Sequence, residues 1–480
     1  MPVTVIGLGP GPLEQMSLGA WRVIERVPEV HVRTFRHPTV RALPEGLVVH
    51  SFDRVYEAHD SFEAVYQDIA ERVVELGRRP EGVVYAVPGH PLVGEVSVQK
   101  VVALARREGI SVEIVPSESF ISPILVALGL DGLELQVVDA TEVASGWHPF
   151  LRVDGPAILG QLYNRETASQ VKLTLLNAYP EDHEVVLVQA AGSPEQVVRR
   201  LPLSELDRQP DIDHLTSLFV PPRSTPCSLE SFQDTVARLR SPAGCPWDRE
   251  QSHQTLRETL LEEAYEVLEA LDEGDLGALR SELGDLLMQI CMHSQIAVEE
   301  GAFSIYDVIG TINEKIVRRH PHVFRGAAVA GSEEVLRNWE EIKRGERGEG
   351  DSRSLLAGVP RGLPALAQAN AYQKRVARVG FDWRAVAGVW NKVEEELSEL
   401  KRAAQEEDRE REVGDLLFAV VNLSRHLGVD AETALREANR RFRRRFERMQ
   451  ELAVERGLDF PSLPLVEQDQ LWNEVKAQER

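Results

Sequence analysis

The chain has 480 residues, of which 43% are hydrophobic and 27% charged, so it is a globular protein too long for one hydrophobic core. The net charge of −23 argues against a protein that binds nucleic acids or an anionic membrane directly, because both need a basic face. Cys227, Cys245 and Cys291 form no C-x-x-C pair, and neither a signal peptide nor a membrane span is recognisable. We therefore expect a cytoplasmic protein without a disulfide framework.

Strand-like runs and helical patterns alternate over the first 200 residues. Helical periodicity covers residues 18–27 and 61–76. Short runs rich in Val and Ile, typical of buried strands, lie at 3–9, 82–89, 112–116, 135–140, 157–163 and 184–192. This alternation predicts an α/β domain with a largely parallel first sheet, and the shorter spacers after about residue 134 favour a second, mixed sheet.

Two glycine-containing loops follow predicted strands in this region. Gly7, Gly9 and Gly11 would let a ligand approach the backbone closely, but their spacing is not that of a dinucleotide fingerprint. A structural turn and a ligand loop therefore both remain open from these residues alone. The second loop, residues 88–91, follows the run VVYAV.

Together the two loops resemble those of the tetrapyrrole methylase family, over about residues 1–200. The resemblance implies a domain that binds S-adenosylmethionine. Its cofactor-binding residues would be Gly7, Gly9, Gly11, Pro88, Gly89, His90 and Pro91. His90 and Pro12 stand where that family commonly has Asp, and these departures leave the methyl acceptor open.

Two linker-like stretches, rich in proline or in small residues, divide the rest of the chain. Residues 204–228 are rich in proline and predict a linker after a domain at 1–203. Residues 346–364, rich in Gly, Ser and Pro, predict a second linker. The segments 229–345 and 365–480 have helical periodicity, as residues 255–271 illustrate.

The two helical segments repeat each other at a nearly constant spacing. The matched pairs are ELGDLLMQ (282–289) with EVGDLLFA (412–419), LLEEAYEVLEAL (260–271) with VEEELSELKRAA (393–404), NEKIVRR (313–319) with NRRFRRR (439–445), and NWEEIK (338–343) with LWNEVK (471–476). Four matches in the same order indicate a duplicated module.

Each module carries five acids on two predicted helices. They are Glu262, Glu263, Glu266, Glu282 and Asp285 in the first, and Glu395, Glu396, Glu399, Glu412 and Asp415 in the second. Acids on one helix are usually a solvated face, but these adjoin the apolar stripe. Facing carboxylates repel one another unless a cation lies between them, and oxygen ligands favour Mg²⁺ or Mn²⁺. The pattern therefore predicts two metal sites.

Basic, amide and tryptophan side chains recur in both modules. Lys315, Arg319, Arg441 and Arg445 are candidates for binding phosphate in the reaction. Candidates for further substrate contacts are Asn313, Trp339, Lys343, Asn439, Trp472 and Lys476. Metal, phosphate-binding cations and a possible base platform together suggest hydrolysis of a nucleotide.

The pattern E-E-x-x-E followed by E-x-x-D resembles the MazG family of all-α nucleoside triphosphate pyrophosphohydrolases, as do the segments RRHPHVF and VGFDW. The resemblance implies hydrolysis of nucleoside triphosphates to monophosphate and pyrophosphate, with Glu263 and Glu396 among the catalytic acids. It also implies a homodimer. If only one module turns over, we expect the second to be the active one.

The predicted fold is thus multidomain: a tetrapyrrole methylase-like α/β domain followed by two all-α, MazG-type modules. The expected role is nucleotide-pool housecleaning. The alternative is a methyltransferase that uses S-adenosylmethionine and whose helical half is a non-catalytic metal- and nucleotide-binding dimerisation module. A third hypothesis is a nucleotide sensor without turnover.

Overall fold

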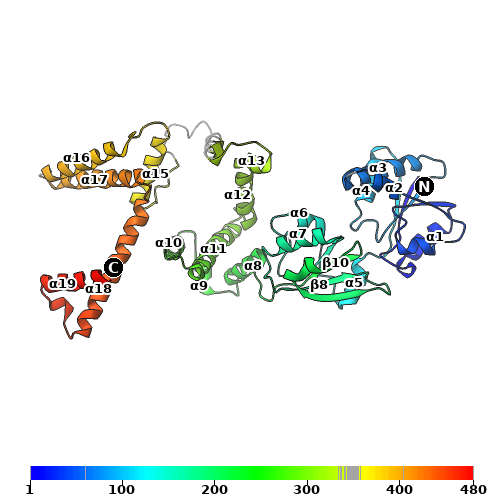
Figure 1. Ribbon diagram of the computed structural model, residues 1–480, viewed down its shortest axis with the longest axis horizontal. Coiled ribbons are helices and arrows are strands. Elements are labelled where there is room, and N and C mark those ends of the chain that lie inside the picture. The colour runs from blue at the N-terminus through cyan, green and yellow to red at the C-terminus, as the bar shows by residue number, and fades with distance from the viewer. Residues whose placement is uncertain are drawn as a thin grey trace. The chain divides into compact units, whose positions relative to one another are not determined.

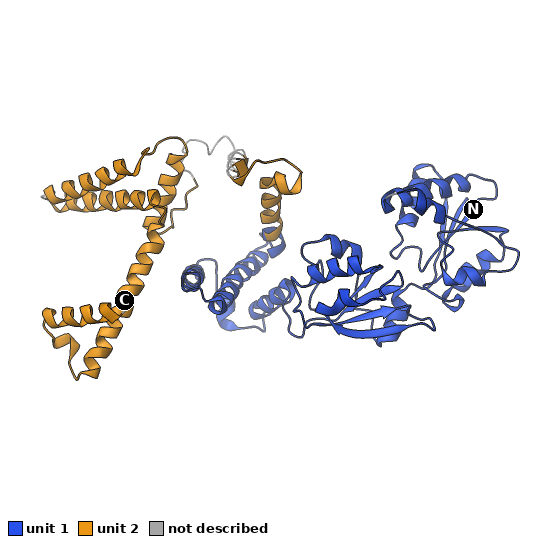
Figure 2. Ribbon diagram, viewed as in Figure 1, with its two compact units in different colours: residues 1–308 blue, residues 309–480 orange. Residues whose placement is uncertain are grey.

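The computed structural model describes residues 2–59, 61–332, 334–335, 338–339, 342, 356, 358–403 and 405–478. The chain forms two compact units, residues 1–308 and 309–480, which Figure 2 shows in different colours. Figure 1 labels the helices and strands. Among the described residues, no helix combines the length and the apolar character needed to cross a membrane.

A parallel five-stranded sheet forms the amino-terminal part, as the sequence predicted. Its strands are β1 (Val3–Gly7), β2 (Glu29–Val32), β3 (Val48–Ser51), β4 (Val83–Val87) and β5 (Val112–Val115), in the order β3-β2-β4-β1-β5. Consecutive residues of β1 point to opposite faces. Val5 packs in the core under α3 (Phe62–Gly77) and α4 (Val96–Arg107), whereas Ile6 packs in the core beside α1 (Leu18–Ile24). The sheet is therefore covered on both faces.

The second sheet is mixed, which confirms the prediction drawn from the shorter spacers. Its elements are α5 (Ile121–Leu128), β6 (Gln136–Asp139), α6 (Ala140–Ser145), β7 (Ala157–Gly160), α7 (Arg165–Leu175), β8 (Glu184–Gln189), β9 (Val197–Pro202) and β10 (Thr216–Val220). The strand order is β6-β7-β10-β8-β9, and only the β6–β7 pair is parallel.

The expected linker at 204–228 is wrong as a whole, because it contains β10. Every residue of Thr216–Val220 is buried, and the strand pairs with β7 on one side and β8 on the other. Pro221 and Pro222 lie just beyond the last ladder residue, so they end the strand without interrupting it. The predicted bounds of the two helical segments, 229–345 and 365–480, and of the second linker, 346–364, stay predictions.

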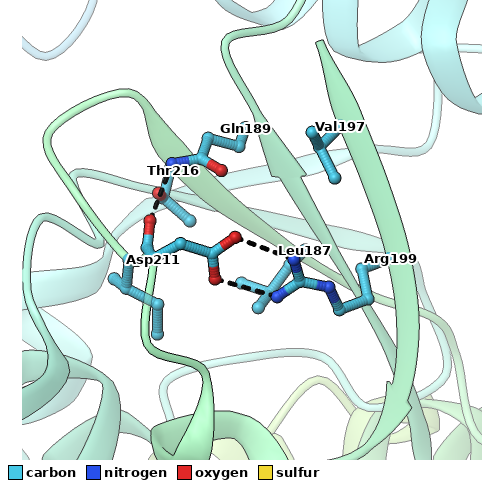
Figure 3. Close-up of a pocket in the computed structure, with 7 residues that line it drawn as sticks. Leu187, Gln189, Val197, Arg199, Asp211 and Thr216 are labelled. Carbon is cyan, nitrogen blue, oxygen red and sulfur yellow. Dashed lines mark hydrogen bonds and ion pairs between the residues drawn. The ribbon is translucent and has the colours of Figure 1, made fainter. Parts of the chain in front are cut away.

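An ion pair fastens the edge strand β9 to the loop that precedes β10 (Figure 3). Arg199 donates two hydrogen bonds to the Asp211 carboxylate, at 2.9 and 2.7 Å, and Gln189 Nε2 donates to the Asp211 carbonyl at 2.7 Å. The pair lines a small hollow over the sheet. This geometry is that of a structural contact at a sheet edge.

The remainder of the described chain is helical, which confirms the all-α prediction. Its longer helices are α8 (Leu229–Arg240), α10 (Arg257–Glu273), α11 (Leu276–Glu299), α12 (Ile305–Arg319), α15 (Ala365–Ala377), α16 (Val386–Arg402), α17 (Glu406–His426), α18 (Ala431–Glu455) and α19 (Leu465–Gln478). In each module the two acid-bearing helices pack together, α10 with α11 and α16 with α17. Gly274 ends α10 with a left-handed φ of 70°, and Asp275 caps α11.

The Asp154 carboxylate joins the second sheet to the first helix of the helical part. It accepts hydrogen bonds from the backbone N–H groups of Cys227 at 2.8 Å and Ser228 at 3.0 Å. It also accepts from the hydroxyls of Ser228, at 2.5 Å, and Ser231. Ser228 in turn caps α8. Despite partial burial, these donors hold the pKa of Asp154 well below its usual value.

Candidate active sites

The two glycine-containing loops meet at the carboxyl ends of β1 and β4. The Gly89 N–H donates to the Gly9 carbonyl at 2.7 Å, and the Gly9 N–H donates back to the Gly89 carbonyl at 3.3 Å. Both residues have positive φ, 77° and 64°, which glycine adopts at little cost. Because β1 and β4 are neighbours in a parallel sheet, the loops that follow them emerge at the same edge.

Buried hydroxyl groups fix the first of these loops. Thr39 Oγ1 lies 3.1 Å from the Leu8 carbonyl and 2.8 Å from the Gly11 carbonyl, and Ser117 Oγ donates to the Gly7 carbonyl at 2.6 Å. The Gly7–Gly11 backbone is therefore held in one conformation. A loop that is already held in one conformation is suited to binding a ligand. The cofactor role of these glycines stays a prediction.

Two histidines near these loops have different surroundings. His37 is only 7% exposed, and burial lowers its pKa to about 4, so its ring is neutral at pH 7. His90 is half-buried, and its Nδ1 accepts a hydrogen bond from the Leu92 N–H at 3.1 Å. This contact gives His90 a structural role in the turn, beside the cofactor role that the resemblance implies for residues 88–91.

The second helical module brings three of its five acids together. Ligand oxygens of Glu396, Glu399 and Glu412 all lie within 4.8 Å of one another. Glu396 and Glu412 are 6% and 8% exposed, which is unusual for glutamate. Glu395 and Asp415 are exposed. The three acids, called the second acid cluster below, form a carboxylate group of the kind that holds a divalent cation.

Two cations contact the second acid cluster. Lys392 Nζ lies 2.7 Å from Glu396 and 3.0 Å from Glu395, and these contacts raise the pKa of the lysine above its usual value. Arg411 lies 3.0 Å from Glu412. Buried carboxylates need such partners, because an unpaired buried charge is costly.

A pocket of about 400 Å³ opens beside the second acid cluster. Its walls come mainly from α15, α16, α17 and the segment 381–383. The charged lining residues include Lys392, Glu396 and Asp415, and the aromatic ones include Tyr372, Phe381 and Trp383. Aromatic walls with a few polar groups are typical of sites for flat organic ligands.

A hydrogen-bonded network stiffens the polar wall of this pocket. The Asp382 carboxylate accepts from Arg425 at 2.6 Å and from His426 at 3.0 Å. Arg425 also donates to the Asn422 side chain at 2.7 Å. Although burial opposes it, the donors lower the pKa of Asp382. Asp382, Asn422 and Arg425 all line the pocket, so its polar edge is held by fixed charges.

The first module gathers a similar group of acids without those cations. Glu263, Glu266 and Glu282 have ligand oxygens within 4.8 Å of one another. Glu263 and Glu282 are half-buried, and Glu262, Glu266 and Asp285 are exposed. Burial, together with the neighbouring Asp285 and Glu266 charges, raises the pKa of Glu263. Burial and the Glu266 charge likewise raise the pKa of Glu282.

The cause of this difference lies in two substitutions between the repeats. The positions that match Lys392 and Arg411 are Thr259 and Ser281 in the first module. The first acid cluster (Glu263, Glu266 and Glu282) thus lacks the matching basic residues. The acids of the first module therefore repel one another without these basic partners, and the pKa values of Glu263 and Glu282 are raised.

The predicted basic and tryptophan residues lie on other helices of the modules. Arg445 lies over the Trp472 ring, 5.6 Å from its centroid, and Arg319 lies 5.3 Å from the centroid of Trp339. The repeated pairing supports the duplication. Asn313, Lys315, Asn439, Arg441 and Lys476 are exposed.

Several of the predicted substrate-binding residues are not among those that line the pocket or lie in the same unit as the acids. The residues that line the pocket do not include Asn439, Arg441, Arg445, Trp472 or Lys476. Lys315 and Arg319 belong to the unit 309–480, whereas the first acid cluster belongs to the unit 1–308, so their pairing stays a prediction. Lys343 lies outside the described residues.

The sequence interpretation missed the pocket residues. Lys392 was not singled out, although it precedes Glu396 by one helical turn, a spacing that could have been noticed. The segment VGFDW was recognised as a family pattern without a role for Phe381, Asp382 or Trp383. Asn422 and Arg425 carry no local signal, because only helix packing brings them to the pocket.

Sequence comparisons match three families along the chain. Residues 2–207 match tetrapyrrole (corrin/porphyrin) methylases, residues 251–324 the MazG nucleotide pyrophosphohydrolase domain, and residues 367–442 phosphoribosyl-ATP pyrophosphohydrolase. These matches confirm the resemblances drawn from the loops and the acid pattern. They define the class of protein as a methylase domain fused to all-α nucleotide pyrophosphohydrolase modules.

Individual relatives cover the whole chain or one part of it. The uncharacterized protein YabN of Bacillus subtilis is 43% identical over 488 residues, spanning 100% of this chain and 99% of that protein. The nucleoside triphosphate pyrophosphohydrolase/pyrophosphatase MazG of Thermotoga maritima is 47% identical over 249 residues, or 52% of this chain and 96% of that protein. A solved uroporphyrin-III-C-methyltransferase from Thermus thermophilus is 27% identical, with a TM-score of 0.36, over 46% of this chain and 93% of that chain. The chain belongs to the family of fusion proteins that includes YabN, and its helical half belongs to the MazG family.

Proposed function

We propose that this protein hydrolyses nucleoside triphosphates to nucleoside monophosphate and pyrophosphate, mainly in its second helical module. The observation that carries this proposal is the second acid cluster, whose two buried glutamates lie beside an aromatic-walled pocket of about 400 Å³. The substrate named for the Thermotoga maritima relative supports the same chemistry. The role we propose is control of the nucleotide pool in the cytoplasm, by a homodimer.

The donor set of the second acid cluster fits Mg²⁺ or Mn²⁺. Three carboxylates within 4.8 Å, two of them buried, supply only hard oxygen ligands. Glu395 and Asp415 stand next to them on the same two helices and would complete the set. When bound, such a cation activates a water molecule and neutralises charge on the leaving pyrophosphate.

The other side chains of the site would bind and orient the substrate. Phe381 and Trp383 offer aromatic surfaces on which a base could stack. Lys392 is close enough to Glu396 to exchange that contact for a phosphate oxygen. Arg441, Arg445, Asn439, Trp472 and Lys476 remain proposed substrate contacts.

Release of pyrophosphate from a panel of nucleoside triphosphates tests the proposal on the full chain with Mg²⁺. Glu396→Gln should lower turnover at least about 100-fold, since losing a ligand of an activating metal costs several kcal/mol. Glu394→Gln, an exposed acid on the same helix, is the matched control and should change little. Glu263→Gln measures how much of the pyrophosphate release comes from the first module. No pyrophosphate release by wild type would reject the hydrolase, and equal activity in the Glu396→Gln Glu263→Gln double variant would reject the two acid clusters as its active sites.

We also propose that the amino-terminal domain binds S-adenosylmethionine at the loops joined through Gly9 and Gly89. The paired loops at the carboxyl ends of two central parallel strands support this, because ligands of open α/β sheets bind at that edge. Calorimetric titration of the full chain with S-adenosylmethionine is the test. Binding of this cofactor without pyrophosphate release would favour the methyltransferase alternative, and absence of binding would remove it.

A further inference from the structure

We propose a binding site for a zinc-type divalent metal ion on the first sheet, with Glu29, His31 and His50 as ligands. Ligand atoms of these three side chains all lie within 4.8 Å of one another. The site is separate from both acid clusters and from the glycine loops, and it would take a borderline-soft cation that prefers imidazole.

Strand geometry explains why these side chains converge. Glu29 and His31 are two residues apart on β2, so they point to the same face of the sheet. His50 pairs directly with His31 in the register of the parallel β2–β3 ladder, and its side chain therefore shares that face. The two rings stack with centroids 4.7 Å apart. The backbone of two adjacent strands thus fixes all three positions.

The distances within the group are close to those of a tetrahedral metal site. His31 Nε2 lies 3.8 Å from one carboxylate oxygen of Glu29, and His50 Nε2 lies 3.3 Å from the other. Ligand atoms about 2.0–2.1 Å from a tetrahedral Zn²⁺ lie roughly 3.4 Å from one another. Small side-chain rotations would therefore bring all three atoms to one ion, with the fourth position left to water.

An unsatisfied nitrogen favours a metal over a purely structural cluster. His31 is 8% exposed, and its Nε2 is buried without a hydrogen-bond partner. Buried polar atoms rarely lack a partner, and 3.8 Å to Glu29 is too long for a hydrogen bond. A metal ion would satisfy that nitrogen. Arg79 opposes binding, because its guanidinium lies 3.1 Å from Glu29.

The position of the site indicates what the ion would do. β3 is an edge strand of the sheet, and His50 is its ligand, while Glu29 and His31 belong to the inner strand β2. Glu29 begins β2, whereas His31 and His50 are each the third residue of a four-residue strand, so the site lies on a face of the sheet. The ion would fasten the edge strand to the sheet.

Zinc titration of the metal-free full chain in excess Mg²⁺ tests the assignment, because Mg²⁺ occupies oxygen-only sites and competes poorly for imidazole. We expect one zinc ion per chain, and the strong visible absorption of tetrahedral cobalt when Co²⁺ replaces it. His50→Ala should weaken binding by more than about 100-fold, since even outer-shell partners are worth 10–100-fold. His214→Ala, an exposed histidine in the same unit, should leave binding unchanged.

Two further results decide the ligand set. Arg79→Ala keeps all three ligands and removes the competing guanidinium, so it should tighten zinc binding several-fold. Weaker binding in Arg79→Ala would contradict Glu29 as a ligand. Unchanged zinc binding in His50→Ala, or a wild type without the tetrahedral cobalt spectrum, would overturn the site, even if pyrophosphate release were intact.

Discussion

The Lys392 ammonium lies 2.7 Å from the Glu396 carboxylate, one turn further along the same helix. This contact offsets part of the negative charge of the second acid cluster, and an entering divalent cation competes with the lysine for Glu396. The matching position in the first module is Thr259, and the acids there have raised pKa values instead. The two modules therefore differ in how they limit the repulsion between their carboxylates. The second module uses basic side chains, whereas acids of the first have raised pKa values.

Lys392→Met should separate two effects of the lysine, which stabilises the folded module and competes with Mg²⁺ for Glu396. Without Mg²⁺ the helical module should lose about 1 kcal/mol of unfolding free energy, because the lysine is partly exposed and its ion pair is screened. Mg²⁺ should bind several-fold more tightly, since its competitor is gone, while KM for the nucleotide rises. Calorimetry and steady-state kinetics measure both effects. Lys401→Met, an exposed lysine on α16, is the control, and weaker Mg²⁺ binding in Lys392→Met would contradict the competition.

Asp154→Asn should weaken the junction between the second sheet and α8. We expect a loss of about 1–3 kcal/mol at pH 7, because a charged cap and several donors lose their acceptor. The folded-state pKa of Asp154 is depressed below the unfolded value of about 3.9, so its stabilisation is complete above about pH 5 and is lost as the pH falls further. Urea unfolding from pH 7 to pH 3 measures this. The difference between variant and wild type should shrink between pH 5 and pH 3 without vanishing, because the depressed folded-state pKa of Asp154 lies below this range. A difference that does not shrink over this range would refute the assignment.

Gly7→Ala and Gly89→Ala should differ sharply although both residues lie in the paired loops. A Cβ at Gly7 would clash with the Gly89 carbonyl oxygen, which is backbone and cannot rotate away. A Cβ at Gly89 meets nothing within 4 Å, so only its positive φ is strained. We expect losses of about 3 kcal/mol and about 1 kcal/mol, measured by thermal unfolding of the full chain. Equal losses would show that the loops are not packed as described.

His37 should make the amino-terminal domain less stable in mild acid. Its folded-state pKa of about 4 lies below the unfolded value of about 6.5, so the unfolded chain takes up the proton first. The resulting loss grows as the pH falls from about 6.5 toward 4 and reaches up to about 3 kcal/mol. His37→Leu should lose less stability than wild type between pH 7 and pH 5 in denaturant titrations. Parallel pH profiles for the two proteins would count against this assignment.

Local patterns predicted the elements whose residues repeat at a regular period. The buried run VVYAV and the amphipathic segment before Leu271 appear as β4 and α10, because burial on a sheet or a helix face requires those periods. β3 and β9 were missed, since VVHS is very short and VVRRLP carries two arginines. β10 was missed because prolines follow it directly.

The candidate sites were predictable only as far as single helices define them. The acid pattern identified the right helix pairs, but helix rotation decides that Glu396, Glu399 and Glu412 converge while Asp415 stays exposed. The network of Asp382 with Arg425 joins residues far apart in sequence. Likewise, only strand register reveals that His31 faces His50. Such contacts depend on tertiary packing.

The central place of β10 has a consequence for how the chain matures during synthesis. β7 and β8 each pair with β10, yet β10 is the last strand of this sheet to leave the ribosome. Until residue 220 has emerged, both strands expose an unpaired edge, the kind of surface that recruits other chains. The nascent amino-terminal half should therefore depend on chaperones until the first helical segment is being translated.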